Sequence, residues 1–209
     1  MKKNITILDY GSGNILSAMQ SFSRIIKSNE LDADICISGN PKSIKHTSHL
    51  VLPGQGAFET CINGLKSIPG MLEELSNYTL EQKKPFFGIC VGMQLLANNS
   101  EENGNHAGLG WIEGTIRKLP SKNLKMPHMG WNSIKVLNNN FKINPKETDY
   151  YFVHSYYFDC KHQENILAET NYGISFPSIV CKENIYGFQF HPEKSSDQGL
   201  NIIKSFLEL

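Results

Sequence analysis

The 209-residue sequence lacks an excess of charge of either sign, and it lacks any apolar run long enough to cross a bilayer. Twenty basic side chains balance twenty acidic ones, and no basic block alternates with aromatic residues. Nucleic-acid binding therefore has no electrostatic support. The apolar segment before Asp9 is too short for a signal peptide. We therefore expect a soluble, cytoplasmic protein that has neither a nucleic acid nor a membrane as its partner.

Cysteine is also scarce, with five residues in all and no pair in CxxC spacing. An odd number at wide separations argues against a disulfide framework and against a structural zinc site. Cys36, Cys160 and Cys181 lie in apolar or strand-like runs, which is typical of small hydrophobic residues without a chemical role. Only Cys90 has a glycine two residues away on each side.

The most informative segment is Pro-Phe-Phe-Gly-Ile-Cys-Val-Gly-Met-Gln-Leu-Leu, at residues 85–96. An apolar run enters Gly88-x-Cys90-x-Gly92 and continues with helical periodicity, which is the layout of a nucleophile elbow with sulfur in place of oxygen. The two glycines permit a sharp turn from strand to helix because they carry no Cβ. We expect Cys90 to be exposed at the tip of this turn, where the positive end of the helix favours thiolate over thiol.

A candidate base and its carboxylate partner follow far downstream in Phe-Gln-Phe-His191-Pro-Glu193. A cysteine nucleophile needs a base within hydrogen-bond reach and a third group that holds the base in one tautomer. In an extended stretch, His191 and Glu193 would point to the same side. Alone, the motif could equally be a strand-end histidine beside a solvated glutamate. Together with the elbow, it predicts a Cys90-His191-Glu193 triad.

Acyl chemistry also requires backbone N–H donors for the developing oxyanion. The amide of Val91, directly after the nucleophile, is one candidate. A second could come from Pro-Gly54-Gln55-Gly56, which follows an apolar strand and whose glycines allow close approach to a ligand. A plain turn would explain the same residues.

The pattern of elements predicts an α/β fold. Strand-like segments at 4–9, 33–37, 49–52 and 85–90 alternate with segments of helical period at 15–26, 57–65 and 70–78. Such alternation favours a parallel sheet covered on both faces. After about residue 109 short strand-like segments predominate, at 110–116, 132–136, 150–154, 165–169 and 185–190, before a closing helix at 197–207. No linker is long enough to divide the chain, so we expect a single domain over residues 1–209.

Two loops have less specific signals. Gly11-Ser-Gly13-Asn14 follows the first strand, but Leu16 occupies the position of the third glycine of a dinucleotide fingerprint, so a turn or a partner contact is favoured. The segment 126–132 places Met129 and Trp131 in a loop rich in proline and glycine. Two large apolar side chains there suit an interface anchor, although a flap over the core is an equal alternative.

These motifs together resemble the class I, triad-type glutamine amidotransferases. Gly-Ile-Cys-x-Gly-Met-Gln-Leu-Leu and Phe-His-Pro-Glu-Lys-Ser are similar to the nucleophile and His/Glu motifs of that family. Segments 9–14, 52–58 and 127–132 narrow the resemblance to the glutaminase subunits of imidazole glycerol phosphate synthase. The resemblance spans residues 5 to about 205. One departure is Gln55, where the family usually has a small aliphatic residue.

The resemblance implies a Rossmann-like three-layer domain, with a mostly parallel central sheet and additional antiparallel strands in the C-terminal half. It implies hydrolysis of glutamine to glutamate and ammonia, without a metal or an organic cofactor. Gln94 and the segment His154-Ser155-Tyr156 resemble positions of the glutamine pocket, although a strand end with satisfied polar groups would also explain that segment. The implied partner is a cyclase subunit with a (β/α)8 barrel, in a heterodimer that makes imidazole glycerol phosphate in histidine biosynthesis. Positions near that interface are Asn14, Met129, Trp131 and Lys194.

Two alternatives stay open at this stage. A paralogous glutaminase could supply ammonia to a sugar amidotransferase in surface-glycan biosynthesis, because the acceptor is bound by the partner and not by the triad. A catalytically silent regulatory subunit is the rival from another class, and the intact Cys90, His191 and Glu193 argue against it.

Overall fold

The computed structural model describes residues 2–120, 124–138, 141, 143 and 149–209. The strands of its main sheet span Lys3–Leu8 (β1), Ala33–Ser38 (β2), His49–Gly54 (β3), Phe86–Cys90 (β4), Lys135–Val136 (β9), Ile166–Tyr172 (β12), Ile174–Lys182 (β13) and Ile185–Phe188 (β14). Within the described residues this sheet has eight strands in the order β2-β1-β3-β4-β14-β13-β12-β9. The neighbouring strands β2, β1, β3, β4 and β14 pair in parallel. The strands β13, β12 and β9 continue the sheet in antiparallel pairing.

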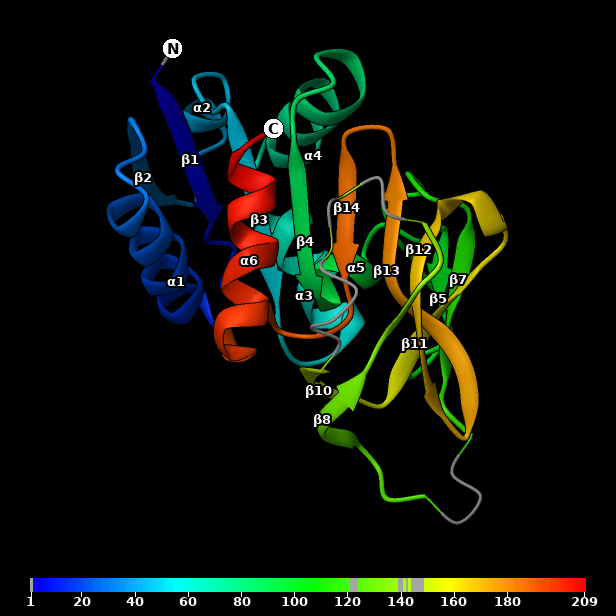
Figure 1. The fold of residues 1–209 in the computed structure, drawn as a ribbon. Coiled ribbons are helices and arrows are strands. Elements are labelled where there is room, and N and C mark those ends of the chain that lie inside the picture. Colours follow the sequence, from blue (N-terminus) through cyan, green and yellow to red (C-terminus); the bar gives the residue numbers. More distant parts are fainter. Residues whose placement is uncertain (1, 121–123, 139–140, 142, 144–148) are drawn as a thin grey trace.

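Helices cover both faces of the parallel half (Figure 1). They span Ile15–Ser28 (α1), Pro41–Ile44 (α2), Phe58–Ser67 (α3), Met71–Ser76 (α4), Val91–Gln94 (α5) and Ser196–Leu207 (α6). Figure 1 shows α1 and α6 in front of the sheet and α3 behind it, and α1 and α6 contact each other. The aromatic rings of Phe22 on α1 and Phe206 on α6 both pack against Phe87 on β4, with centroid distances of 5.7 and 4.8 Å. These contacts bury the apolar stripes of both helices against the sheet.

Two smaller sheets complete the C-terminal half. One contains Asn99–Ser100 (β5), His106–Ala107 (β6), Gly114–Lys118 (β7) and Tyr156–Cys160 (β11), in the order β11-β7-β5-β6. The other pairs His128–Ser133 (β8) with Asp149–His154 (β10) in antiparallel register. The end of β10 carries Val153 and His154, which line the pocket of the molecule.

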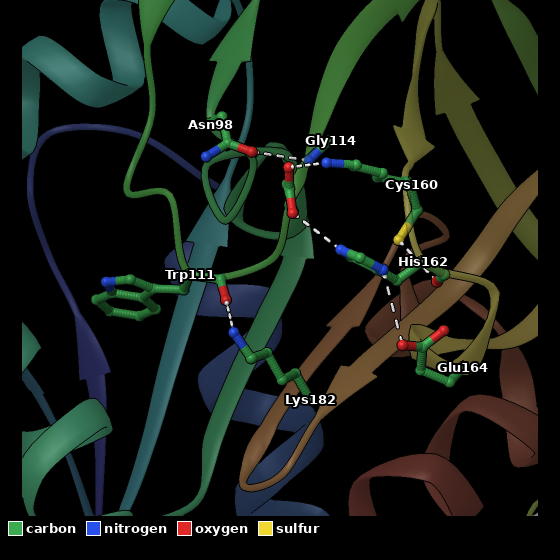
Figure 2. Close-up of polar contacts among 9 residues, drawn as sticks. Asn98, Trp111, Gly114, Cys160, His162, Glu164 and Lys182 are labelled. Carbon is green, nitrogen blue, oxygen red and sulfur yellow. Dashed lines mark hydrogen bonds and ion pairs between the residues drawn. The ribbon is translucent and has the colours of Figure 1, made fainter.

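Polar contacts fasten the loop between β6 and β7 to its surroundings (Figure 2). Nζ of Lys182 donates to the carbonyl of Trp111 at 3.0 Å. The carboxylate of Glu113 contacts Nζ of Lys161 at 2.5 Å and Nε2 of His162 at 2.8 Å. Because the ion-paired side chains are largely exposed, these pairs contribute little to stability. Their effect is to fix the position of the loop, with little contribution to the free energy of unfolding.

The predicted fold class is confirmed, since a mostly parallel sheet carries antiparallel strands in its C-terminal half. The helix predicted at 70–78 is confirmed as α4, which continues as a π-helix over Asn77–Glu81. The strand predicted at 110–116 is wrong in its first part, because the strand begins only at Gly114. The strand β13, which pairs with both β12 and β14, was not predicted.

The segment 126–132 is also corrected, because His128–Ser133 forms the strand β8 and not a loop. Gly130 has a φ of 127° and lies opposite Phe152 of β10. Glycine and proline weaken the local strand signal, and pairing with β10, which is distant in sequence, supplies the hydrogen bonds that compensate.

Close backbone approaches hold β3, β4 and α5 together, and glycine is required at each of them. A Cβ on Gly92 would lie 2.0 Å from the carbonyl oxygen of Leu52, and one on Gly54 would lie 2.4 Å from the nitrogen of Gly92. A Cβ on Gly88 would lie 2.7 Å from the carbonyl oxygen of Gly92. The prediction that Gly88 and Gly92 permit the turn at Cys90 is confirmed, and Gly54 is a third member of this contact.

We predict that Gly92→Ala destabilises the protein by about 3 kcal/mol or more, because its Cβ collides with backbone that cannot move independently. Urea denaturation of the purified variant measures this. Gly11→Ala is the matched comparison, since Gly11 has a φ of 81° but no atom near its Cβ position. It should cost only about 1 kcal/mol, from the left-handed backbone alone. Equal losses in the two variants would contradict the close-packing explanation.

Candidate functional site

A pocket of about 240 Å³ lies where the parallel strands β3 and β4 end, at Gly54 and Cys90. The carboxyl ends of such strands are where open α/β sheets bind ligands. Its lining contains most of the residues selected from the sequence, together with three that were not. The lining residues are Gln55, Gly56, Cys90, Val91, Gln94, Glu102, Pro127, Val153, His154, Ser155, Tyr156, His191 and Lys194.

Cys90 occupies a strained turn between β4 and α5. Its φ of 53° and ψ of −109° are unusual for a residue with a side chain, and strain of this kind persists where surrounding packing enforces it. The expectation of an exposed tip is wrong, because Cys90 is only 4% exposed. Gly54 of the neighbouring strand and the pocket walls cover it, while the residue still lines the pocket.

His191 and Glu193 form a buried pair beside this thiol. Nδ1 of His191 and Oε1 of Glu193 are 2.8 Å apart, and both side chains are almost completely buried. The prediction that the two residues lie in an extended stretch is wrong, because Pro192–Lys194 forms a 3-10 turn. This turn still brings the carboxylate to the ring, because it folds Glu193 back towards His191.

The electrostatic environment of His191 favours its charged form. Burial alone would lower the pKa of His191, but the neighbouring Cys90 and Glu193 outweigh burial and raise this pKa above its usual range. Nε2 of His191 is buried and has no hydrogen-bond partner within the described residues. The ring of His191 therefore has one nitrogen held by Glu193 and a second nitrogen that makes no hydrogen bond within the described residues.

The two backbone segments predicted to supply oxyanion donors line the pocket together with Cys90. Val91 is the first residue of α5, where N–H groups have no partner within the helix. Opposite it, Gly56 has a φ of 95° and Gln55 is exposed, and both line the pocket. The carbonyl of Gln55 accepts a hydrogen bond from Oγ of Ser12 at 2.7 Å. Gly54, which was also predicted here, does not line the pocket. It allows the close approach of β3 to the backbone of Gly92.

The far wall of the pocket contains Gln94, His154, Ser155 and Tyr156. The carbonyl of Tyr156 accepts from Nε2 of Gln94 at 3.0 Å and from Nδ1 of His154 at 2.8 Å. Because a carbonyl can only accept, these two contacts fix the amide orientation of Gln94 and the tautomer of His154.

A second buried histidine extends this wall. With its proton on Nδ1, His154 must accept at Nε2, and Nδ1 of His128 lies 2.9 Å away as the donor. Nε2 of His128 then accepts from the side-chain amide of Asn132 at 3.1 Å. The result is a directed chain of hydrogen bonds from β8 to the pocket wall.

The residues predicted at an interface lie on several elements. Met129 and Trp131 are 61% and 53% exposed, and they share one face of β8. Lys194 lines the pocket itself. Asn14 caps α1, since its side chain accepts from the amide of Ser17, which gives it a structural role as well.

Sequence analysis did not identify two polar residues of this region, Glu102 and Gln189. Glu102 lines the pocket, and its Oε2 accepts from the amide of Phe58 at 2.8 Å. In the sequence it follows Glu101, and nothing there distinguishes the two carboxylates. Gln189 is completely buried near Cys90, and an amide between Phe188 and Phe190 is the signal that could have identified it.

In the described part of the chain, none of the helices has both the length and the apolar character needed to cross a membrane. Among the same residues, no group of three or more histidine, cysteine or acidic side chains is arranged to hold a metal ion.

Comparison with known proteins places the chain in a family. The family model described as "Glutamine amidotransferase class-I" matches residues 6–209. The chain is 41% identical to "Imidazole glycerol phosphate synthase subunit HisH" of Pelagibacter ubique, over 99% of this chain and 100% of that protein. It is 42% identical to the protein of the same name from Rhodospirillum rubrum, over 97% of each chain.

Solved structures support the same fold at lower sequence similarity. A crystal structure of a glutamine amidotransferase superimposes with a TM-score of 0.71 at 18% identity, covering 98% of this chain and 97% of the other. A glutamine amidotransferase from Thermotoga maritima gives a TM-score of 0.65 at 16% identity, covering 100% and 97%.

We predict that the protein loses stability as the pH falls from about 6.5 to about 4. Burial lowers the pKa of His49 and His128 to about 4 and that of His154 to about 3. Between these values and 6.5 the unfolded chain binds protons that the native protein excludes. Unfolding is thus favoured by about 1.4 kcal/mol per pH unit for each such proton.

The free energy of unfolding, measured by urea denaturation at several pH values, tests this dependence. His49→Leu should reduce the slope by the contribution of one proton. An identical slope in wild type and His49→Leu would contradict the assignment.

Proposed function

The chain belongs to the class-I glutamine amidotransferases, and from this premise we propose that Cys90, His191 and Glu193 hydrolyse glutamine to glutamate and ammonia. The observation that carries the proposal is that Cys90 from β4 and His191 from the segment after β14 line one pocket, while Glu193 contacts the His191 ring from behind at 2.8 Å. The pocket also contains backbone and side-chain groups suited to a small zwitterionic amide.

The proposed reaction begins with attack of the Cys90 sulfur on the side-chain carbonyl carbon of glutamine. As the sulfur attacks, the thiol gives its proton to Nε2 of His191, whose raised pKa favours accepting it. The tetrahedral oxyanion accepts hydrogen bonds from the amide of Val91 and from the Gln55–Gly56 loop. Collapse breaks the C–N bond, the imidazolium gives its proton to the nitrogen, and ammonia leaves behind a glutamyl thioester.

Water then cleaves the thioester. Neutral His191 removes a proton from the water molecule as it attacks, and a second tetrahedral intermediate collapses to glutamate and the thiolate. Oε1 of Glu193 accepts from Nδ1 of His191 and so keeps the proton on that nitrogen, which leaves Nε2 to face the reaction. His191 thus acts as base and acid in turn, and Glu193 positions it.

The charges and the hydrogen-bond directions of the pocket residues suggest which group of glutamine each of them binds. Glu102 presents a carboxylate to the pocket and suits the α-ammonium group, while its bond to Phe58 holds it in place. Gln94 directs its NH2 group into the wall, so its oxygen is the atom that can accept from the substrate amide. Ser155 and Tyr156 complete this side of the pocket.

We further propose that the ammonia is delivered to a partner cyclase subunit with a (β/α)8 barrel, in the synthesis of imidazole glycerol phosphate during histidine biosynthesis. The support is the name of the relatives, which the chain matches over nearly its full length. The exposed Met129 and Trp131 offer an apolar docking surface on β8. Asn14 and Lys194 are proposed contacts of the same partner.

The glycan paralogue has the same glutaminase chemistry, so the partner distinguishes the two functions. Co-purification with a cyclase supports the histidine pathway, whereas co-purification with a sugar amidotransferase supports the alternative. A silent regulatory subunit would show no glutamine hydrolysis in either complex.

We predict that Cys90→Ala abolishes glutamine-dependent synthesis by the complex but leaves synthesis from added ammonium salts intact, because the acceptor chemistry belongs to the partner. Product formation from each nitrogen source measures this. Cys36→Ala, which changes an exposed cysteine, is the matched control and should retain both activities. Equal loss from both nitrogen sources in Cys90→Ala would contradict separate production of ammonia.

We predict that Glu102→Gln raises KM for glutamine roughly tenfold or more and changes kcat little, because a charge-assisted hydrogen bond to the substrate is lost. Steady-state glutaminase kinetics measure both constants. Glu101→Gln is the control, since Glu101 pairs with Arg117 at 2.8 Å and does not line the pocket. The assignment fails if the two variants have the same KM.

A further inference from the structure

Gln189 is a buried amide next to the nucleophile that the proposed mechanism does not use. It follows the end of β14 and is 0% exposed, between the buried rings of Phe188 and Phe190. Its backbone amide donates to the carbonyl of Ser178 on β13 at 2.9 Å, which fixes its place in the sheet. An uncharged polar side chain is costly at such a position unless its hydrogen bonds are made.

The contacts of Gln189 have a defined direction. The carbonyl of Tyr156 obliges Gln94 to turn its NH2 group towards the wall, and the same NH2 group donates to Oε1 of Gln189 at 3.2 Å. Oε1 of Gln189 is thereby identified as the acceptor, which leaves its NH2 group facing the other way. That group lies 3.9 Å from Sγ of Cys90.

Besides His191, two polar groups contact the sulfur, and their effects on it are opposite. The carbonyl of Val153 lies 3.9 Å from Sγ and can only accept, so it favours the protonated thiol. The NH2 group of Gln189 can only donate, so it favours the thiolate. Hydrogen bonds to an ionised partner are shorter and stronger than those to a neutral one, so the contact from Gln189 strengthens when the sulfur becomes charged.

We propose that Gln189 is a positioning residue of the reaction, which presents an N–H donor to the Cys90 thiolate and holds Gln94 with its oxygen facing the pocket. One side chain thereby couples the nucleophile to the substrate-binding wall. The proposal rests on the proposed glutaminase function for its kinetic consequences. The contact with the sulfur can be tested independently of that function.

The test compares wild type with Gln189→Met, which preserves volume but removes both the donor and the acceptor. The first measurement is the rate at which iodoacetamide, a small neutral alkylator, modifies Cys90 at pH 7, followed by peptide-resolved mass spectrometry because Cys36 is exposed. We expect a roughly tenfold slower reaction, since loss of a hydrogen bond to a charged group reduces the thiolate population. The rate should recover at high pH, where the thiolate forms without assistance.

Steady-state kinetics are the second measurement, and we expect kcat to fall roughly tenfold with a smaller change in KM. Gln189→Glu keeps an acceptor for Gln94 and lacks the N–H donor, so it should slow alkylation at pH 7 as well. It also keeps the test available if Gln189→Met does not fold. Ser178→Ala is the control, because it removes a buried hydroxyl from the adjacent strand without touching the amide contacts.

A merely structural role predicts the opposite change, because a loosened site would expose Cys90 and accelerate its alkylation. Unchanged or faster alkylation in both Gln189 variants would overturn the proposal. Absence of glutamine hydrolysis in the wild type would refute the proposed function instead, and the alkylation rates would still decide the role of Gln189.

Discussion

The structure depends on the close packing of β3, β4 and α5, which places one cysteine in a left-handed conformation at the end of a buried strand. Gly54, Gly88 and Gly92 leave no room for side chains at this junction. Because the backbone there cannot relax, Cys90 keeps a φ of 53° that an ordinary turn would abandon. The position of the sulfur is therefore set by the fold itself, and the rest of the site is arranged around it.

The remaining groups reach this sulfur from distant parts of the chain. His191 and Glu193 arrive after β14, which pairs with β4 in parallel and so ends at the same edge of the sheet. The wall around His154 arrives from β10, which belongs to a different sheet. Each element contributes one kind of group to the site: a thiol, an imidazole ring paired with a carboxylate, and the polar groups of the lining. The site thus combines rigid strands with short connecting turns, an arrangement that favours precise positioning.

The sequence was sufficient for the N-terminal half of the fold and for the residues of the proposed triad. Alternating apolar strands and amphipathic helices can be read from local sequence. The glycines of Gly-x-Cys90-x-Gly directly indicate a sharp turn that has no room for a Cβ. The same reasoning failed for β8, because Gly130 and Pro127 resemble a loop until β10 pairs with that strand. It also failed for the burial of Cys90, since the covering residues come from segments distant in sequence.

Polar residues that act through other residues were the hardest to predict. Glu102 becomes recognisable only when its partner Phe58 is known, whereas Gln189 has the weak signal of an amide between two aromatic residues, which gives no role until its contact with Gln94 is seen. The tautomers of His128 and His154 are likewise a property of the assembled chain of hydrogen bonds. Composition and periodicity carry no information of this kind.

The proposed reaction requires that the Cys90 sulfur attack a glutamine side chain bound in the pocket. Mass spectrometry after treatment with an electrophilic glutamine analogue, with and without glutamine as a competitor, tests this step directly. We expect one adduct per chain, located on Cys90 and suppressed by glutamine. Labelling of another cysteine, or labelling of Cys90 that glutamine does not suppress, would contradict it.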